Sequence, residues 1–416
     1  MQKNWIFETE VVLSVARLLE MIPTPFSSPS LGDSLEKEQK QAILQAFSSS
    51  LSLITGGPGT GKSFTAASLA THFIQAGARV VLAAPTGKAA SKLQELSSIP
   101  AFTLHFLLNF PSEERKPLPY DLILVDEASM IDARLFAALL SSIKEGTRLV
   151  LMGDPHQLPS VDAGSFFADL VEVAKKGAIA HTHLGKIFRL ESLALIDFAA
   201  SVKEAKEEMV FSHLESSSCI KRVSFQKEED LFSHVSAFFP LPCKEFVEEE
   251  LFDKLSKFVI LSSMREGPFG VHAINYALVQ KMKEQVQEGE RLILPILIQK
   301  NDEKLQLYNG ERGFLISGKE EYALFKTKEG FRKIPRFALP RFEYGYALSI
   351  HKSQGSEYDR VLLFLPKGSE RFGREVLYTA VTRVKKEIEV SLCDETLTLL
   401  LRHKEKRRSS LCERLG

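Results

Sequence analysis

The stretch GGPGTGKS, residues 56–63, is the most informative segment of this chain of 416 residues. It fits the pattern G-x-x-x-x-G-K-[ST], in which a glycine-rich turn surrounds the phosphates of a nucleotide with backbone N–H groups. The spacing predicts that Lys62 reaches the β- and γ-phosphates and that Ser63 holds Mg²⁺. ATP or GTP is therefore the expected ligand, but the loop alone does not indicate what its hydrolysis serves.

Outward from this loop, short apolar runs predict a parallel sheet. Continuous runs of this length suit strands that are buried on both faces, and helical stretches such as GKSFTAASLATHFIQAG separate them. Ligands of such sheets lie at the carboxyl ends of the strands. The runs are LSLITG (51–56), RVVLAAP (79–85), LILVDE (122–127) and RLVLMGD (148–154). Each leads into a polar motif, so GGPGTGKS, PTGKAA, DEAS and GDPHQLPS are expected to meet at one nucleotide site.

A second α/β unit is expected further along the chain, with strands in KFVILSSM (257–264), RVLLFLP (360–366) and EIEVSLC (387–393). Before its later strands, short alternating runs broken by turn sequences such as NG and SGKEE are typical of a small antiparallel β-barrel. The expected parts are a short helical segment over 1–34, a first ATPase unit over 35–184 with a reduced insertion near 97–120, a second unit over 185–290 and 343–416, and the β insertion over 291–342.

The composition argues against several other classes of protein. Lys and Arg number 53, as do Asp and Glu, so net charge gives no sign of a nucleic-acid partner. The four cysteines show no C-x-x-C spacing, which argues against a disulfide framework or zinc site and suits a reducing cytosol. His181 and His183 lack companions for a metal site, so we interpret them as ordinary histidines. With no signal peptide and no apolar run of bilayer length, we expect a cytoplasmic protein.

Acidic and amide side chains follow the third and fourth predicted strands. Asp126 and Glu127 stand at the end of a buried strand, where two carboxylates are costly unless they face a cation or a cleft. Beside a phosphate-binding loop, Asp126 is predicted to hold Mg²⁺, directly or through water, and Glu127 to act as general base on the attacking water. Gln157, after the next strand, is predicted to contact both the γ-phosphate and that water.

Phosphoryl transfer also needs positive charge near the equatorial phosphate oxygens, and an arginine from another domain can supply it. Two arginines fit by position. Arg189 in HLGKIFRLES follows the first unit, and Arg383 in YTAVTRVKK leads into the last strand of the second. If both point at the nucleotide, ATP bridges two units and its hydrolysis moves them, which is how a molecular motor works.

Taken together, these motifs resemble those of superfamily-1 DNA helicases of the RecD type, the alpha subunits of exonuclease V. The resemblance runs from about Gln39 to Cys393, and the matching stretches stand in the family's order. One departure is Leu190, where glutamine commonly follows the arginine of IFR. The stretches are EKEQKQAI (36–43), GGPGTGKS, APTGKAASKL (84–93), TLHFLL (103–108), VDEAS (125–129), GDPHQLPSV (153–161), IFR (187–189), MREGPFGVHAIN (264–275), YNGERG (308–313), YALSIHKSQGSEYDRVLL (346–363) and LYTAVTRVKK (377–386).

The resemblance implies an ATP-dependent 5′→3′ helicase or translocase on single-stranded DNA in recombinational double-strand-break repair, within an exonuclease V complex with RecB- and RecC-like partners. It implies two RecA-like domains around ATP and Mg²⁺, and an SH3-like insertion over the DNA. Lysines and hydroxyls bind phosphates without reading sequence, as a motor requires. Implied nucleotide contacts are Gln39, which reads the adenine, the loop residues Gly56, Gly57, Pro58, Gly59, Thr60, Gly61, Lys62 and Ser63, and also Phe64 and Gly355. Implied DNA contacts are Thr86, Lys88, His105, His351, Lys352, Ser353 and Gln354.

Other features differ from the family or leave alternatives open. Only about 34 residues precede EKEQKQAI, where relatives have a larger domain that contacts partners, and residues 7–22 read as one amphipathic helix. Relatives that act alone have a β-hairpin in the segment corresponding to 109–120, but Pro117 and Pro119 disfavour a paired hairpin there. For Thr86 and Lys88, a solvated helix start is a competing interpretation. The alternative function is an ATP-switched DNA-binding module that serves a partner helicase or nuclease without unwinding DNA itself; an RNA helicase is a third.

Overall fold

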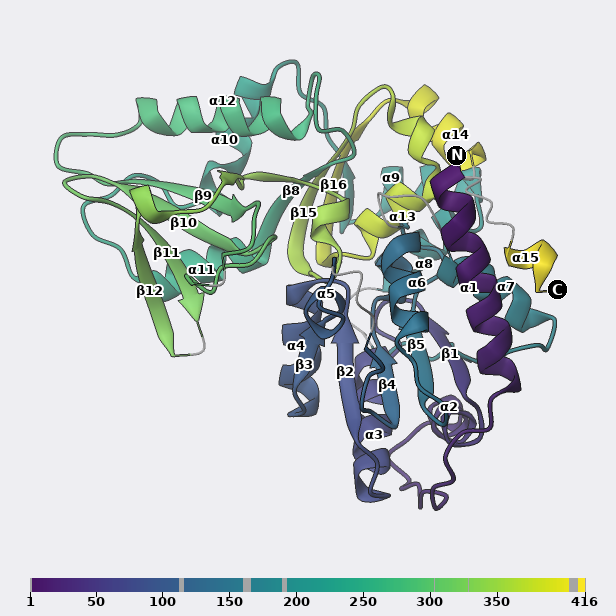
Figure 1. The fold of residues 1–416 in the computed structure, drawn as a ribbon. Helices are drawn as coiled ribbons and strands as arrows, with labels where there is room; N and C mark the ends of the chain where they lie inside the picture. The colour runs from purple at the N-terminus through teal and green to yellow at the C-terminus, as the bar shows by residue number, and fades with distance from the viewer. Residues whose placement is uncertain are drawn as a thin grey trace. The chain divides into compact units, whose positions relative to one another are not determined.

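The computed structural model describes residues 2–111, 116–159, 166–188, 193–302, 304–327, 329–403 and 411–415. The chain divides into two compact units, of residues 1–190 with 406–416 and of residues 191–405 (Figure 1). Each unit contains a five- or six-stranded parallel sheet, as the apolar runs predict. In the described part of the chain, no helix is long and apolar enough to cross a lipid bilayer.

A six-stranded parallel sheet with the order β3-β2-β4-β5-β1-β6 forms the centre of the first unit. The strands are β1 Leu51–Gly56, β2 Val80–Ala84, β3 Ala101–Thr103, β4 Leu122–Val125, β5 Arg148–Gly153 and β6 Ala180–Leu184. The four predicted strands are confirmed. Because β4, β5 and β1 are neighbours, the motifs that follow them lie along one edge of the sheet.

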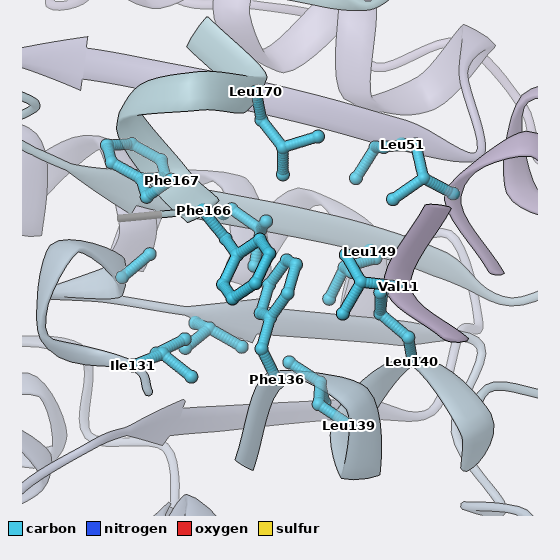
Figure 2. Close-up of a cluster of buried hydrophobic side chains, with 14 of the residues drawn as sticks. Val11, Leu51, Ile131, Phe136, Leu139, Leu140, Leu149, Phe166, Phe167 and Leu170 are labelled. Carbon is cyan, nitrogen blue, oxygen red and sulfur yellow. The ribbon is translucent and has the colours of Figure 1, made fainter. Parts of the chain in front are cut away.

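Alternate side chains of this sheet pack into two different apolar cores, which is why its strands read as continuous apolar runs. Leu149 and Leu151 of β5 face the core formed with α1, α6 and α7, and Val150 and Met152 face the core formed with α2 and α3. Figure 2 shows part of the first core. The helices of this unit are α1 Gln2–Glu20, α2 Lys37–Ser48, α3 Lys62–Gln75, α4 Gly87–Ser97, α5 Leu104–Leu107, α6 Ala133–Ser141, α7 Phe166–Lys175 and α15 Leu411–Arg414.

Both ends of the chain pack onto the first unit. The amphipathic helix predicted over 7–22 forms as α1, whose Val11 is fully buried in the first core. Arg17 of α1 donates to the carbonyl of Leu140 at 3.0 Å, near the end of α6, where a positive charge is favourable. At the other end, Leu411 of α15 is fully buried in the same core. Residues 411–415 therefore belong to the first unit, whereas the sequence analysis placed all of 343–416 in the second.

The second unit has a five-stranded parallel sheet with the order β14-β8-β15-β16-β7. Its strands are β7 Ile220–Arg222, β8 Phe258–Ser262, β14 Ala347–Ser349, β15 Tyr358–Leu365 and β16 Val384–Leu392. The longer strands β8, β15 and β16 are the predicted ones, whereas β7 and β14 are too short for their composition to predict them. The helices are α8 Leu193–Lys203, α9 Glu207–Ser216, α10 Leu231–Val235, α11 Glu248–Lys257, α12 Val271–Glu284, α13 Arg374–Val381 and α14 Asp394–Arg402.

The β insertion predicted over 291–342 forms an antiparallel sheet with the order β12-β11-β10-β9-β13. Ile296 of β9 and Phe325 of β11 share one buried cluster with Ile260 and Leu362 of the parallel sheet. On its other face, Phe314 packs against α11. The insertion is thus joined to the second unit through continuous cores. Its strands are β9 Leu292–Ile298, β10 Arg312–Ser317, β11 Glu321–Thr327, β12 Gly330–Pro335 and β13 Phe342–Tyr344.

Asn275 of α12 holds the short strand β14 in place. Its Nδ2 donates to the Ala347 carbonyl at 3.0 Å, and its Oδ1 accepts from the Ala347 N–H at 2.9 Å. The side chain is only 5% exposed, so an alanine would leave two buried backbone groups unpaired, each at a cost of about 1–3 kcal/mol. We expect Asn275→Ala to lower the free energy of unfolding by about 2–4 kcal/mol, measured by urea titration with far-UV circular dichroism.

The matched control for this prediction is Lys283→Ala, which changes an exposed residue of the same helix. It should alter the free energy of unfolding by less than about 0.5 kcal/mol. If the Asn275 variant unfolds like that control, the amide does not anchor β14.

Candidate active site

The phosphate-binding loop leaves β1 at Gly56 and enters α3 at Lys62. Gly59 and Gly61 have φ angles of 74° and 78°, a left-handed conformation that favours glycine. The Lys62 ammonium donates to the carbonyl oxygens of Gly56 and Gly57 at 2.8 and 2.9 Å. These contacts place the positive charge against the loop that the sequence predicts to bind phosphates.

Close packing fixes the start of the loop. A Cβ atom on Gly56 would lie 2.5 Å from Thr60 Oγ1 and 3.1 Å from the carbonyl oxygen of Leu184, so no larger residue fits there without a shift. Thr60 is nearly fully buried, and its hydroxyl donates to the Gly57 carbonyl at 2.8 Å. The loop is therefore preorganised by its own residues and by the end of β6.

Asp126 and Ser63 provide oxygen atoms beside this loop. Asp126 is 7% exposed, and its Oδ2 accepts from the Ser63 hydroxyl at 3.4 Å, while its Oδ1 accepts from the Glu127 N–H at 2.8 Å. Glu127 has a φ angle of 53°, so the chain turns sharply after Asp126. Carboxylate and hydroxyl oxygens next to a phosphate site are the protein ligands that Mg²⁺ uses. The donor set thus fits the predicted metal.

Gln157 lies in the loop after β5. Its Nε2 donates to Asp154 Oδ2 at 3.3 Å, and both side chains are nearly fully buried. Its Oε1 is also buried but accepts no hydrogen bond from any described residue. A buried carbonyl oxygen without a donor is unfavourable, so this atom is suited to accept from a bound water molecule, the contact that the sequence predicts.

Two side chains lie next to Gly61 at the other side of the loop. A Cβ atom on Gly61 would lie 3.0 Å from Gln39 Nε2 and 3.4 Å from the Phe188 ring. The Phe188 N–H donates to the Gly59 carbonyl at 2.8 Å, so Phe188 is part of the loop's surroundings. The sequence analysis did not predict a role for this residue, because it considered only the arginine of the IFR motif. The aromatic residue directly before that arginine could have indicated a contact with the loop. Phe64, in the first turn of α3, is 53% exposed.

His181 and His183 of β6 both contact the hydroxyl of Thr55 in β1. His181 Nε2 lies 2.8 Å and His183 Nδ1 lies 3.0 Å from Thr55 Oγ1. Burial lowers the pKa of His181, and the neighbouring His183 contributes in the same direction. The pair therefore ties β6 to β1 directly below the phosphate-binding loop.

The predicted DNA contacts of the first unit follow two neighbouring strands. Ala84 of β2 pairs with Thr103 of β3, which places Thr86 and His105 shortly beyond adjacent strand ends. The Thr86 hydroxyl accepts from the Ala89 N–H at 3.3 Å as the cap of α4, so the helix-start interpretation describes one of its contacts. Lys88 and His105 are exposed. The described residues of segment 109–120 contain no strand, which agrees with the effect expected of its prolines.

The predicted DNA contacts of the second unit lie in the turn after β14. Lys352 Nζ donates to Glu343 Oε1 at 2.6 Å, and His351 is partly exposed. Ser353 is fully buried and its hydroxyl donates to the Ile350 carbonyl at 2.6 Å, so it stabilises the turn rather than facing solvent. Gln354 is also buried, and Gly355 has a φ angle of 74°.

Of the two predicted arginines, Arg383 lies among the described residues. Arg189 lies outside the described residues. Arg383 is 4% exposed, and its guanidinium donates to the carbonyls of Thr379 and Ser356 at 3.3 and 3.4 Å and to the Thr382 hydroxyl at 3.1 Å. These long contacts hold the side chain within its own unit.

Comparison with known families and proteins identifies relatives of this chain. The AAA domain family matches residues 34–224, and the UvrD-like helicase C-terminal domain matches residues 344–389. The RecBCD enzyme subunit RecD of Mycolicibacterium smegmatis is 31% identical, over 100% of this chain and 82% of its own length. The ATP-dependent RecD2 DNA helicase of Deinococcus radiodurans is 29% identical, over 92% of this chain and 52% of its own length.

Solved structures show a related fold. The crystal structure of Pif1 helicase from Candida albicans has a TM-score of 0.53 with this chain at 20% sequence identity, covering 87% of this chain and 95% of that one. At this identity the likeness concerns the fold alone.

Proposed function

Because the chain belongs to the RecD family of superfamily-1 DNA helicases, we propose that it moves 5′→3′ along single-stranded DNA and serves as the alpha subunit of an exonuclease V-type complex. Family membership makes it an ATP-dependent DNA helicase of recombinational repair. The direction of movement, the RecB- and RecC-like partners and a cytoplasmic location are our proposals. The observation that best supports an ATP-driven motor is the position of Lys62, Asp126 and Gln157 along one edge of one parallel sheet.

We propose the following roles at the nucleotide. The loop N–H groups and Lys62 bind the phosphates, and Gln39 contacts the adenine. Ser63 and Asp126 hold Mg²⁺, which neutralises charge on the phosphate oxygens. Glu127 accepts a proton from the attacking water, and Gln157 orients that water. Arg189 and Arg383 stabilise the charge that develops in the transition state and link hydrolysis to movement of the units.

We propose that the DNA backbone is held by Thr86, Lys88 and His105 of the first unit and by His351 and Lys352 of the second. The β insertion supports a role on DNA through its charge, since residues 291–342 contain eleven Lys and Arg against six Asp and Glu in a chain of zero net charge. We propose that it is an SH3-like module that covers the bound strand.

The dependence of ATP hydrolysis on DNA length tests translocation. A motor that travels hydrolyses more ATP per binding event on a longer strand, because it leaves mainly at the end. With saturating oligothymidylates of about 10 to 60 nucleotides, we therefore expect the steady-state rate to rise with length beyond the binding-site size of about 4–16 nucleotides. A rate that stays constant beyond that size contradicts translocation and supports an ATP-switched binding module instead.

A further inference from the structure

Glu343, on β13 of the insertion, contacts two cations of the second unit. Its Oε1 accepts from Lys352 Nζ at 2.6 Å, and its Oε2 lies 3.4 Å from Arg265 Nη2. The side chains of Glu343 and Lys352 are 18% and 22% exposed. The pair is thus partly shielded from water, where an ion pair is stronger than at a fully exposed surface.

The fold explains why these residues meet. Glu343 pairs with Leu297 of β9 at an edge of the antiparallel sheet. The chain then enters β14, which runs parallel to β8, so the segments that follow these two strands are neighbours. Arg265 follows β8 and Lys352 follows β14. One carboxylate of the insertion therefore faces two cations from adjacent ends of the parallel sheet.

A carboxylate and a DNA phosphate are alternative anions for the same ammonium group. We propose that Glu343 is an internal competitor of DNA: it holds Lys352 and Arg265 when no strand is bound, and a backbone phosphate displaces it when a strand enters. This inference rests on the proposed function, in which Lys352 contacts DNA. Arg265 becomes a second backbone contact, which gives a role to the MREGPFG stretch. The competition lowers the affinity of the second unit for the DNA backbone and lets the bound phosphate exchange. A motor that releases and rebinds DNA requires such exchange.

The test is Glu343→Gln, which removes the charge and keeps the shape. Binding of a fluorescent oligothymidylate would be measured by anisotropy without nucleotide at several salt concentrations. In the parent, DNA binding must break the ion pairs of Glu343, and the displaced carboxylate regains a counterion; the variant avoids both costs, so we expect a Kd about 3- to 10-fold lower at about 50 mM salt. The slope of log K against log salt should also become steeper by about 0.7. Glu343→Asp, which keeps the carboxylate, should bind DNA like the parent.

The matched control is Glu284→Gln, at the opposite end of α12 from Arg265. Glu284 pairs with Lys281 at 2.8 Å, so this variant makes the same change of charge outside the insertion. It should change Kd by less than about twofold, since a charge beyond about one Debye length is largely screened. Combining Glu343→Gln with Lys352→Ala should remove most of the gain, because the freed cation is then missing.

The outcomes separate this inference from the proposed function. If the parent binds single-stranded DNA and Lys352→Ala weakens binding, but Glu343→Gln binds no more tightly than the parent, the competition is overturned and the DNA contact of Lys352 stands. The same holds if Glu284→Gln gains as much as Glu343→Gln. If the parent binds no single-stranded DNA, the proposed function fails, and the inference fails with it. Thermal unfolding by circular dichroism verifies that each variant is folded.

Discussion

Replacing Lys62 by alanine is expected to lower the DNA-stimulated rate of ATP hydrolysis by on the order of 10²–10³-fold, because it removes a preorganised positive charge from the phosphates. The ammonium contacts the carbonyls of Gly56 and Gly57 and has no part in the fold of the DNA-binding segments. Binding of single-stranded DNA without nucleotide should therefore stay within about twofold of the parent. Both quantities are measured on the same preparation, by phosphate release and by fluorescence anisotropy.

Lys175→Ala is the matched control, since Lys175 is an exposed lysine of the same unit that pairs with its helix neighbour Glu172. Its rate of hydrolysis should equal that of the parent. An unchanged rate in Lys62→Ala would mean that the loop is not the site of hydrolysis, whatever else the chain binds.

Glu127→Gln is expected to lower the turnover number for ATP by on the order of 10²–10⁴-fold, the usual contribution of a general base. The amide keeps the shape of the side chain but accepts no proton from the attacking water. Asp126 and Ser63 remain in place, so ATP and Mg²⁺ should still bind. Single-turnover hydrolysis and equilibrium binding of a fluorescent ATP analogue separate the two effects.

Glu145→Gln, at an exposed position of the same unit, makes the same chemical change away from the site and should leave turnover unchanged. If Glu127→Gln hydrolyses ATP at the parent rate, Glu127 is not the base. If it instead loses binding of the analogue, the residue acts in nucleotide binding and the proposed division of roles between Asp126 and Glu127 is wrong.

Local patterns predicted the parts of this protein that depend on residues close in sequence. The loop around Lys62, the carboxylates after β4 and the buried strands follow from spacing and from apolar runs, because backbone geometry and burial on both faces constrain each of them locally. The resemblance to the family also predicted which further motifs contact the nucleotide or the DNA, because these motifs stand in the family's order along the chain.

Contacts between distant residues were not predictable in this way. Phe188 reaches the loop through a backbone hydrogen bond to Gly59, and Asn275 secures Ala347. β14 has only three residues, so its composition does not predict a strand. It forms a strand through its pairing with β8. The pairing of Lys352 with Glu343 likewise depends on how the insertion packs against the parallel sheet. These features are set by tertiary packing, which can stabilise segments of weak intrinsic preference.

The most direct test of the proposed 5′→3′ helicase activity is unwinding by the purified chain of partial DNA duplexes that have only a 5′ or only a 3′ single-stranded tail. ATP hydrolysis would be recorded in the same reactions, with Lys62→Ala as the inactive control. We expect strand separation from the 5′-tailed substrate alone, with hydrolysis stimulated by both tails. Unwinding from the 3′-tailed substrate alone, or hydrolysis without unwinding of either, would contradict the claim that this chain is a 5′→3′ helicase.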